Sequence, residues 1–148
     1  MKNFGSVCEF ARQRTADLLR VYFACIESCA YVRMPEIFES VVNSPAPRFY
    51  ISAPRAAVVV AALDKGDSLS SMRPNKREMF AEIYRRYLIL RAANPAAPVA
   101  HLVRDIVEQP APKFYLSASS AKIIILKARK LWFKEKSKKM QLFSSRLS

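Results

Sequence analysis

Glycine and histidine are scarce in this 148-residue sequence, and both scarcities exclude common kinds of active site. Two glycines are too few for a phosphate-binding glycine-rich loop of the Walker or dinucleotide type. The single histidine, His101, leaves no material for a His-rich metal site and disfavours histidine-based acid–base catalysis. The spacing of the remaining residues defines no Ser–His–Asp or Cys–His set. We therefore expect a protein without enzymatic activity, metal or cofactor.

Cysteines and long apolar runs are also few. The odd number of cysteines, three, argues against a disulfide scaffold. Cys25 and Cys29 share a helical face, but no second Cys/His pair completes a metal site, so buried thiols are the favoured interpretation. The longest apolar run, Ala56 to Leu63, has eight residues, whereas a membrane span needs about 20. No signal-peptide pattern occupies the first 19 residues, and we expect a soluble, intracellular protein without a membrane span.

What the sequence does contain is a tandem repeat with an offset of 65 residues. The segment VVNSPAPRFYISA, Val41 to Ala53, returns as IVEQPAPKFYLSA, Ile106 to Ala118. Seven of the nine positions from Pro45 to Ala53 are identical in the second copy. The same offset aligns residues 16–22 with 81–87 and residues 58–60 with 123–125. The chain is therefore two copies of one unit.

Hydrophobic periodicity, prolines and capping residues predict three helices in each copy. The predicted helices cover residues 8–30, 35–43 and 52–65 in the first copy, and 75–93, 98–108 and 117–139 in the second. Ser52 and Ser117 are the expected N-caps of the third helices, and Gly66 ends the first of these two. The predicted fold class is all-α. Its predicted divisions are a three-helix repeat over 1–66, a linker over 67–74, a second three-helix repeat over 75–133 and a basic helical extension over 134–148.

The Pro-rich segment between the second and third helices of each copy is the most informative motif. Three helices in this order outline a helix-turn-helix DNA-binding unit, but the turn here has eight residues, Ser44 to Ile51, instead of about three or four. The unit is therefore either a helix-turn-helix variant with an elongated turn or an unrelated three-helix unit. Its Phe and Tyr side chains are interpreted as core anchors. Arg48 and its counterpart Lys113 are either phosphate contacts or solvated surface charges.

The repeated PAPRFY-type segment resembles one in uncharacterised small basic proteins of gut bacteria and their phages. The resemblance covers mainly residues 41–53 and 106–118. It implies no activity and no functional residues. If the chain is phage-encoded, its location is a virion instead of the cytoplasm.

The net charge of +13 is unevenly distributed along the chain. Residues 1–66 hold eight basic and six acidic residues, whereas residues 67–148 hold 17 and six. From Lys122 onward, nine basic residues accompany one acidic residue, Glu135. Lys127, Lys130, Lys134 and Lys138 follow helical spacing, which predicts a cationic ridge on the last helix.

A cationic ridge of this kind favours nucleic-acid binding, DNA in particular, through phosphate contacts. A basic helix with aromatic residues also fits an anionic membrane surface or a solvated tail. The alternative function is a structural or assembly protein of a phage or mobile element, in which the repeats make protein contacts, as a homo-oligomer or within a larger assembly. The candidate nucleic-acid-binding residues are Arg48, Arg85, Arg86, Lys113, Lys122, Lys127, Arg129, Lys130, Lys134 and Lys138.

Overall fold

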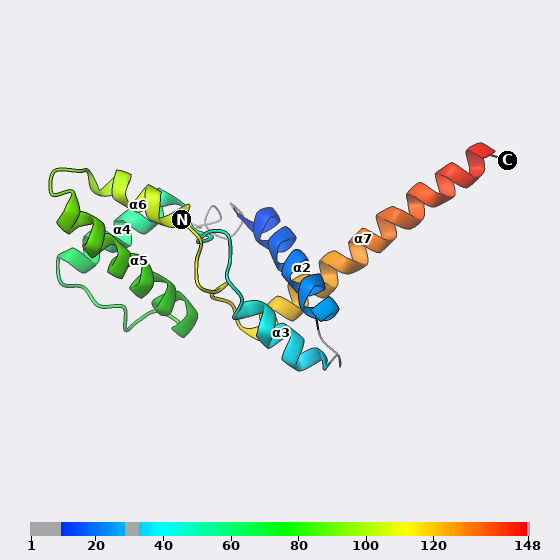
Figure 1. The fold of residues 1–148 in the computed structure, drawn as a ribbon, viewed down its shortest axis with the longest axis horizontal. Coiled ribbons are helices and arrows are strands. Elements are labelled where there is room, and N and C mark those ends of the chain that lie inside the picture. The colour runs from blue at the N-terminus through cyan, green and yellow to red at the C-terminus, as the bar shows by residue number, and fades with distance from the viewer. Residues whose placement is uncertain (1–9, 29–32, 148) are drawn as a thin grey trace.

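The described residues form helices and no named strand, as the sequence predicts, with one isolated β-bridge between Ala46 and Ala111. A computed structural model describes residues 10–28 and 33–147, without the side chains of residues 34, 143 and 145–147. Cys8 and Cys29 therefore lie outside the description, and Cys25 is a half-buried free thiol. The helices are α2 (Ala11–Ser28), α3 (Met34–Val42), α4 (Ala53–Asp64), α5 (Pro74–Ala93), α6 (Val99–Val107) and α7 (Ala118–Leu147) (Figure 1).

The third helices of the two repeats, α4 and α7, begin at equivalent residues. Ser52 caps α4, where its Oγ accepts a hydrogen bond from the Arg55 N–H at 3.4 Å. Ser117 precedes α7, and its Oγ accepts from the Ser120 N–H at 3.1 Å. Each hydroxyl satisfies one of the unpaired N–H groups of a helix N-terminus. Both predicted N-caps are confirmed.

The same two helices end very differently. After Lys65, the C-cap of α4, Gly66 adopts a φ of 101°, a left-handed conformation that glycine reaches without steric cost. The equivalent position in the second repeat is Leu131, and the helix continues through it. As a result α4 has 12 residues and α7 has 30. The predicted extension is thus continuous with the third helix of the second repeat as far as residue 147.

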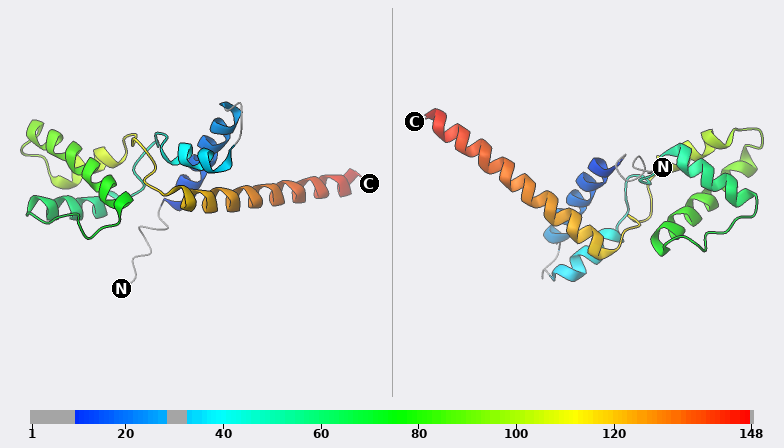
Figure 2. Two further views of the ribbon diagram at one scale, coloured as in Figure 1. Left: turned by 90° about the horizontal axis from the view of Figure 1, so that it is seen from below. Right: turned by 180° about the vertical axis from the view of Figure 1, so that it is seen from behind.

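The third helices are exchanged between the repeats. α7 packs on α2 and α3 of the first repeat, and α4 packs on α5 and α6 of the second. The two packed units, α2/α3/α7 and α4/α5/α6, lie at opposite ends of the molecule, and the C-terminal half of α7 projects away from both (Figures 1 and 2). In each packed unit, the second helix therefore comes from one repeat and the third helix that packs on it comes from the other.

The two Pro-rich segments make this exchange possible by crossing each other in an extended conformation between the units (Figure 1). Ala46 and Ala111 form an antiparallel bridge with two N–H···O bonds of 2.9 Å. Flanking them, the Phe49 N–H donates to the Val107 carbonyl and the Phe114 N–H to the Val42 carbonyl, both at 3.0 Å. Each bond has its counterpart 65 residues along the chain, so the crossing has pseudo-two-fold symmetry.

Aromatic side chains fill the crossing point. Phe49 stacks on Tyr115 with ring centroids 6.0 Å apart, and Tyr50 stacks on Phe114 at 5.9 Å. Phe49 and Phe114 are buried, at 1% and 3% exposure, and both tyrosines pack against the core. The interpretation of these aromatics as core anchors is confirmed. They anchor one repeat to the other.

Candidate nucleic-acid interface

The candidate interface is the outer face of α7. Its inner face contacts α2 and α3 through Ala121 and Ile125, which are fully buried. Because an α-helix advances 100° per residue, the ridge of Lys127, Lys130 and Lys134 falls on the opposite side. Five candidate residues of α7 are exposed, namely Lys122, Lys127, Lys130, Lys134 and Lys138.

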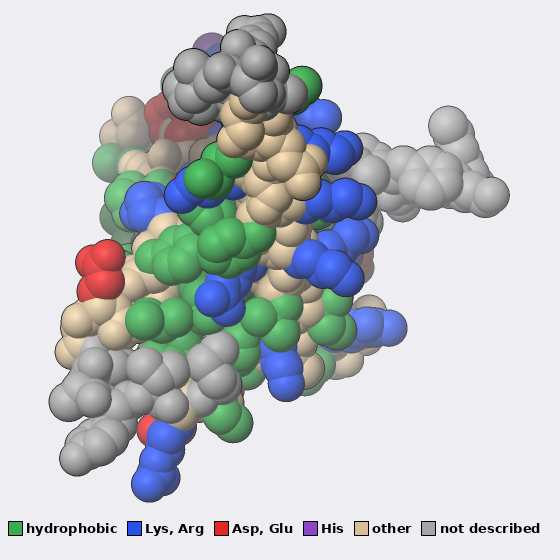
Figure 3. Space-filling model, turned by 90° about the vertical axis from the view of Figure 1, so that its right-hand side faces the viewer, with side chains coloured by type: hydrophobic (Ala, Val, Ile, Leu, Met, Phe, Trp, Pro, Cys, Tyr) green, Lys and Arg blue, Asp and Glu red, His purple; other side chains and the backbone are tan. Residues whose placement is uncertain are grey.

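The ridge is long, and Lys127, Lys130 and Lys134 have no acidic residue three or four positions away on α7, whereas Lys138 has Glu135 three residues before it. From Lys127 to Lys138 it spans about 16 Å at 1.5 Å per residue. Glu135, the one acidic residue of α7, lies on the side of Trp132 and Lys139, with which it shares a shallow pocket. The surface seen along the projecting end of α7 shows Lys and Arg side chains along one flank, beside a hydrophobic area (Figure 3). This face therefore offers closely spaced cations to an extended polyanion.

Arg129 is directed differently from the ridge lysines. It is half-buried and lines a small apolar pocket with Leu19, Phe23 and Trp132, where α7 leaves α2. Its guanidinium carbon lies 5.5 Å from the Phe133 ring centroid, and its Nε is buried without a hydrogen-bond partner among the described residues. Arg129 thus covers the α2–α7 contact and is set apart from the ridge.

The two loop cations, Arg48 and Lys113, make contacts within the protein. The Arg48 Nε donates to the Phe49 carbonyl at 2.9 Å, and its guanidinium lies 3.9 Å from the Phe10 ring centroid. Lys113 pairs with Glu78 of α5 at 2.8 Å and is 27% exposed. Both cations therefore help to fix the crossing segments in place.

Arg85 and Arg86 of α5 share the carboxylate of Glu82. The two ion pairs measure 2.7 and 2.6 Å. Hydrogen bonds from Arg85, and then Arg86, lower the pKa of Glu82 to about 2 despite its partial burial. Arg86 also donates to the Pro110 carbonyl at 3.0 Å and lies 5.0 Å from the Phe49 ring centroid. Arg86 holds the crossing, whereas Arg85 is 61% exposed but locally neutralised.

The structure thus places five of the ten candidate residues at exposed positions of α7, four of them on the ridge and Lys122 on a different side of the helix, and assigns most of the others to internal contacts. Sequence reasoning missed three further basic residues, Arg14, Arg73 and Lys76, which line a pocket beside the crossing. They lie on different helices or helix ends, and Arg14 aligns with Met79 in the other repeat. The only sequence signal that marks them is that the equivalent residue of the other repeat is not basic.

Comparison of the chain with protein-family models, curated protein sequences and solved structures found no match. None of the helices in the described residues combines the length and hydropathy that a membrane span requires. Within the same residues, no group of three or more His, Cys, Asp and Glu side chains is arranged to hold a metal ion.

Proposed function

We propose that the protein binds nucleic acid without catalysis, DNA in particular, through phosphate contacts made by the outer face of α7. The observation that supports this most strongly is the exposed lysine ridge opposite the packed face of the helix. Duplex DNA carries about one negative charge per 1.7 Å of axis, so a ridge of this length faces several phosphates at once. Each lysine that neutralises a phosphate releases counterions, which makes the affinity strongly salt-dependent.

The candidate residues outside the ridge take supporting roles in this proposal. Arg48, Arg86 and Lys113 hold the crossing segments, and Arg85 is paired with Glu82. The second repeat supplies the binding helix, and the first repeat supplies α2 and α3, on which that helix rests. The proposed binding is indifferent to base sequence, because lysine contacts to phosphate carry no sequence information.

The test is a salt titration of binding to a short duplex, followed by fluorescence anisotropy. Replacement of Lys130, Lys134 and Lys138 by Gln should reduce the slope of log K against log[salt] by about 3, at roughly 0.9 per lost phosphate contact. The matched control replaces Lys65, Arg77 and Arg104 by Gln, which removes the same charge from exposed positions of the α4/α5/α6 unit. The control should keep most of the slope. Equal losses in both variants would contradict the proposal.

A second candidate function is assembly with other protein molecules through the repeats. The two repeats expose the same apolar positions: Val58 is 71% exposed and its equivalent Ile123 is 69% exposed, while Phe23 and its equivalent Leu88 are 42% and 48% exposed. Apolar surface presented twice in equivalent places is typical of contact sites. Light scattering with the Val58→Glu and Ile123→Glu double variant tests this function. A defined oligomer that dissociates in the variant supports assembly, and a monomeric wild-type protein excludes self-assembly.

A further inference from the structure

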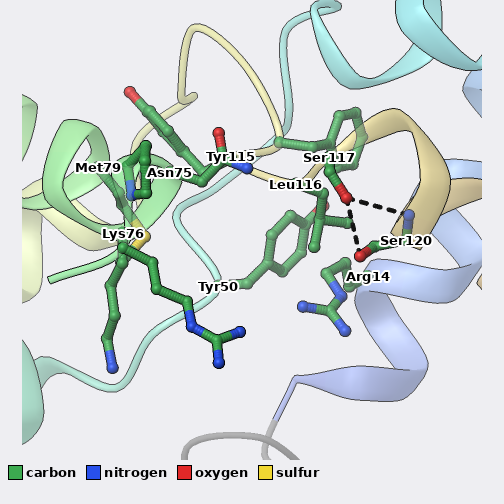
Figure 4. Close-up of a pocket in the computed structure, with 12 residues that line it drawn as sticks. Arg14, Tyr50, Asn75, Lys76, Met79, Tyr115, Leu116, Ser117 and Ser120 are labelled. Atoms are coloured by element: carbon green, nitrogen blue, oxygen red, sulfur yellow. Dashed lines mark hydrogen bonds between the residues drawn. The ribbon is translucent and has the colours of Figure 1, made fainter.

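A pocket lies beside the crossing of the two Pro-rich segments. Its volume is about 490 Å³, within the range of about 300–1,000 Å³ typical of small-molecule sites. α2 contributes one wall, the beginnings of α5 and α7 contribute others, and the crossing segments form the floor (Figure 4). The lining side chains are Arg14, Tyr50, Arg73, Pro74, Asn75, Lys76, Met79, Phe114, Tyr115, Leu116, Ser117 and Ser120.

The charge of this pocket is of one sign. Arg14, Arg73 and Lys76 line it, and no acidic residue does. Arg14 approaches from α2, on the side of the pocket opposite Lys76 of α5 (Figure 4). The Arg14 Nε is buried without a hydrogen-bond partner among the described residues, and burial lowers the pKa of Arg14. An anion in the pocket would supply the missing acceptor and offset the cost of desolvating this guanidinium.

Apolar and aromatic side chains form much of the rest of the wall, beside the neutral polar residues Asn75, Ser117 and Ser120. Tyr50 and Phe114 form one of the stacked pairs of the crossing, and Met79 stands across from them on α5. Tyr115 has a φ of 56°, a left-handed conformation that costs a residue other than glycine some strain. Backbone strain of this kind concentrates at ligand sites, and Tyr50, the equivalent residue, does not share it. The pocket therefore has cations on two opposing sides of its wall, together with apolar and aromatic surface.

The repeat shows why the pocket exists on one side of the crossing. Asn75 lines it, and the equivalent residue of the first repeat is Phe10. The Phe10 ring lies against the Arg48 guanidinium at 3.9 Å, so an aromatic side chain takes the place of a small amide there. Met79 and its counterpart Arg14 both line the pocket, so the difference between Asn75 and Phe10 is what distinguishes the two sides.

We infer that this pocket binds the phosphate monoester of a sugar that also carries a planar base, as in a nucleoside 5′-monophosphate. The phosphate lies between Arg14 on one side of the pocket and Lys76 on the other, with Arg73 also in the lining, and the ring lies against Tyr50 and Met79. Cations give charge-assisted hydrogen bonds to phosphate oxygens, and aromatic side chains accept any base by stacking. The N–H groups at the beginnings of α5 and α7 add a favourable field for the anion. This site is separate from the lysine ridge and does not depend on it.

The test uses the full chain and isothermal titration calorimetry at low salt, with deoxyadenosine 5′-monophosphate as the probe. Deoxyadenosine and inorganic phosphate are titrated in parallel, and both should bind at least about tenfold more weakly because each lacks one half of the ligand. Asn75→Phe inserts the residue of the other repeat without changing the charge. It should abolish nucleotide binding by filling the pocket.

A matched pair of charge variants then distinguishes a direct contact with the nucleotide from the effect of the overall positive charge. Lys76→Gln, in the pocket lining, should weaken nucleotide binding about tenfold, whereas Arg77→Gln, on the next residue and outside the lining, should leave it within about twofold. Equal effects of the two variants, undiminished binding by Asn75→Phe, or binding of inorganic phosphate as tight as that of the nucleotide would each overturn the inference. Circular dichroism verifies that the variants fold. DNA binding by Asn75→Phe should match that of the wild type, so the failure of one proposal is distinguishable from the failure of the other.

Discussion

The two packed units are built from equivalent helices, yet they differ in the length and charge of the third one. In the α4/α5/α6 unit the third helix has 12 residues and ends just before Gly66, whereas in the α2/α3/α7 unit the third helix has 30 residues. α2 and α3 together hold three basic and four acidic residues, and α7 holds nine and one. A nearly neutral pair of helices therefore carries the most basic element of the protein.

This difference shows that the charge of a repeat and the charge of a packed unit are separate quantities. Counted along the chain, the excess positive charge belongs to the second repeat. In space, the exchange of third helices places most of it on the helices of the first. Each repeat therefore contributes helices to both packed units, and the crossing segments connect the two units.

The largest expected effect tests this connection. Phe49→Ala removes a buried ring from the crossing and should lower the free energy of unfolding by about 3–5 kcal/mol, the usual cost of a large cavity in a core. Because the crossing joins both units, unfolding in urea should shift equally by circular dichroism, which reports all helices, and by Trp132 fluorescence, which reports the α2–α7 contact. An unchanged Trp132 midpoint would show that the units unfold independently.

The control for this variant is Phe133→Ala, on the projecting part of α7. Phe133 is 47% exposed, so the loss of its ring should change the free energy of unfolding by less than about 0.5 kcal/mol. A loss comparable to that of Phe49→Ala would mean that truncation of any aromatic residue is costly here, and the special role of the crossing would fail.

The helices and their caps could be predicted from sequence, while their partners could not. Periodicity, Ser52, Ser117 and Gly66 are local signals, and each predicted the correct element. Whether a third helix packs on its own repeat or on the other depends on the direction in which the Pro-rich segment leaves the second helix. The repeated sequence is compatible with either arrangement, because equivalent helices present equivalent apolar faces.

The candidate interface was predictable to a similar extent. Helical spacing found the α7 ridge, because spacing alone determines which residues share a face of a helix. It indicates the i,i+4 ion pair of Arg86 with Glu82, but it could not assign the contact of Arg86 with the Pro110 carbonyl, nor Lys113, whose partner is Glu78. These pairs form between segments separated by 24 or more residues, except for the local pair with Glu82. The pocket beside the crossing was likewise hidden, since its walls meet only after the exchange.

The equivalent tyrosines Tyr50 and Tyr115 allow a test of whether the two sides of the crossing contribute equally to the free energy of unfolding. The Tyr50 hydroxyl donates to Asp17 at 2.6 Å, and burial together with this bond raises the pKa of Tyr50. Tyr115 has no such bond among the described residues, although burial raises its pKa to about 12. Tyr50→Phe should cost about 1–2 kcal/mol in urea unfolding, and Tyr115→Phe less than half of that. Equal costs would show that the two sides are energetically equivalent.

A substitution at the position where α4 ends and α7 continues should have a smaller effect, which the helical content reports directly. Leu131→Gly gives α7 the residue at which α4 stops, and glycine within a helix costs about 1 kcal/mol relative to a good helix former. Because the described residues beyond Lys130 are exposed, little packing opposes the fraying of this part. The helical signal at 222 nm and the affinity for DNA should both fall. Leu131→Ala, as the control, should retain both.

The smallest effect depends on pH and concerns the α5 side of the crossing. The pKa of Glu82 is lowered from 4.5 to about 2, first by its hydrogen bond with Arg85. A carboxyl whose pKa is depressed by folding stabilises the protein fully above its unfolded pKa and loses that contribution as the pH falls towards the folded value. Glu82→Gln should therefore be less stable than the wild type at pH 7, and the difference should shrink between pH 4.5 and about 2. Urea unfolding at a series of pH values measures it. A difference that is constant with pH would mean that the Gln side chain disturbs packing, and that the ion pairs with Arg85 and Arg86 add no stability of their own.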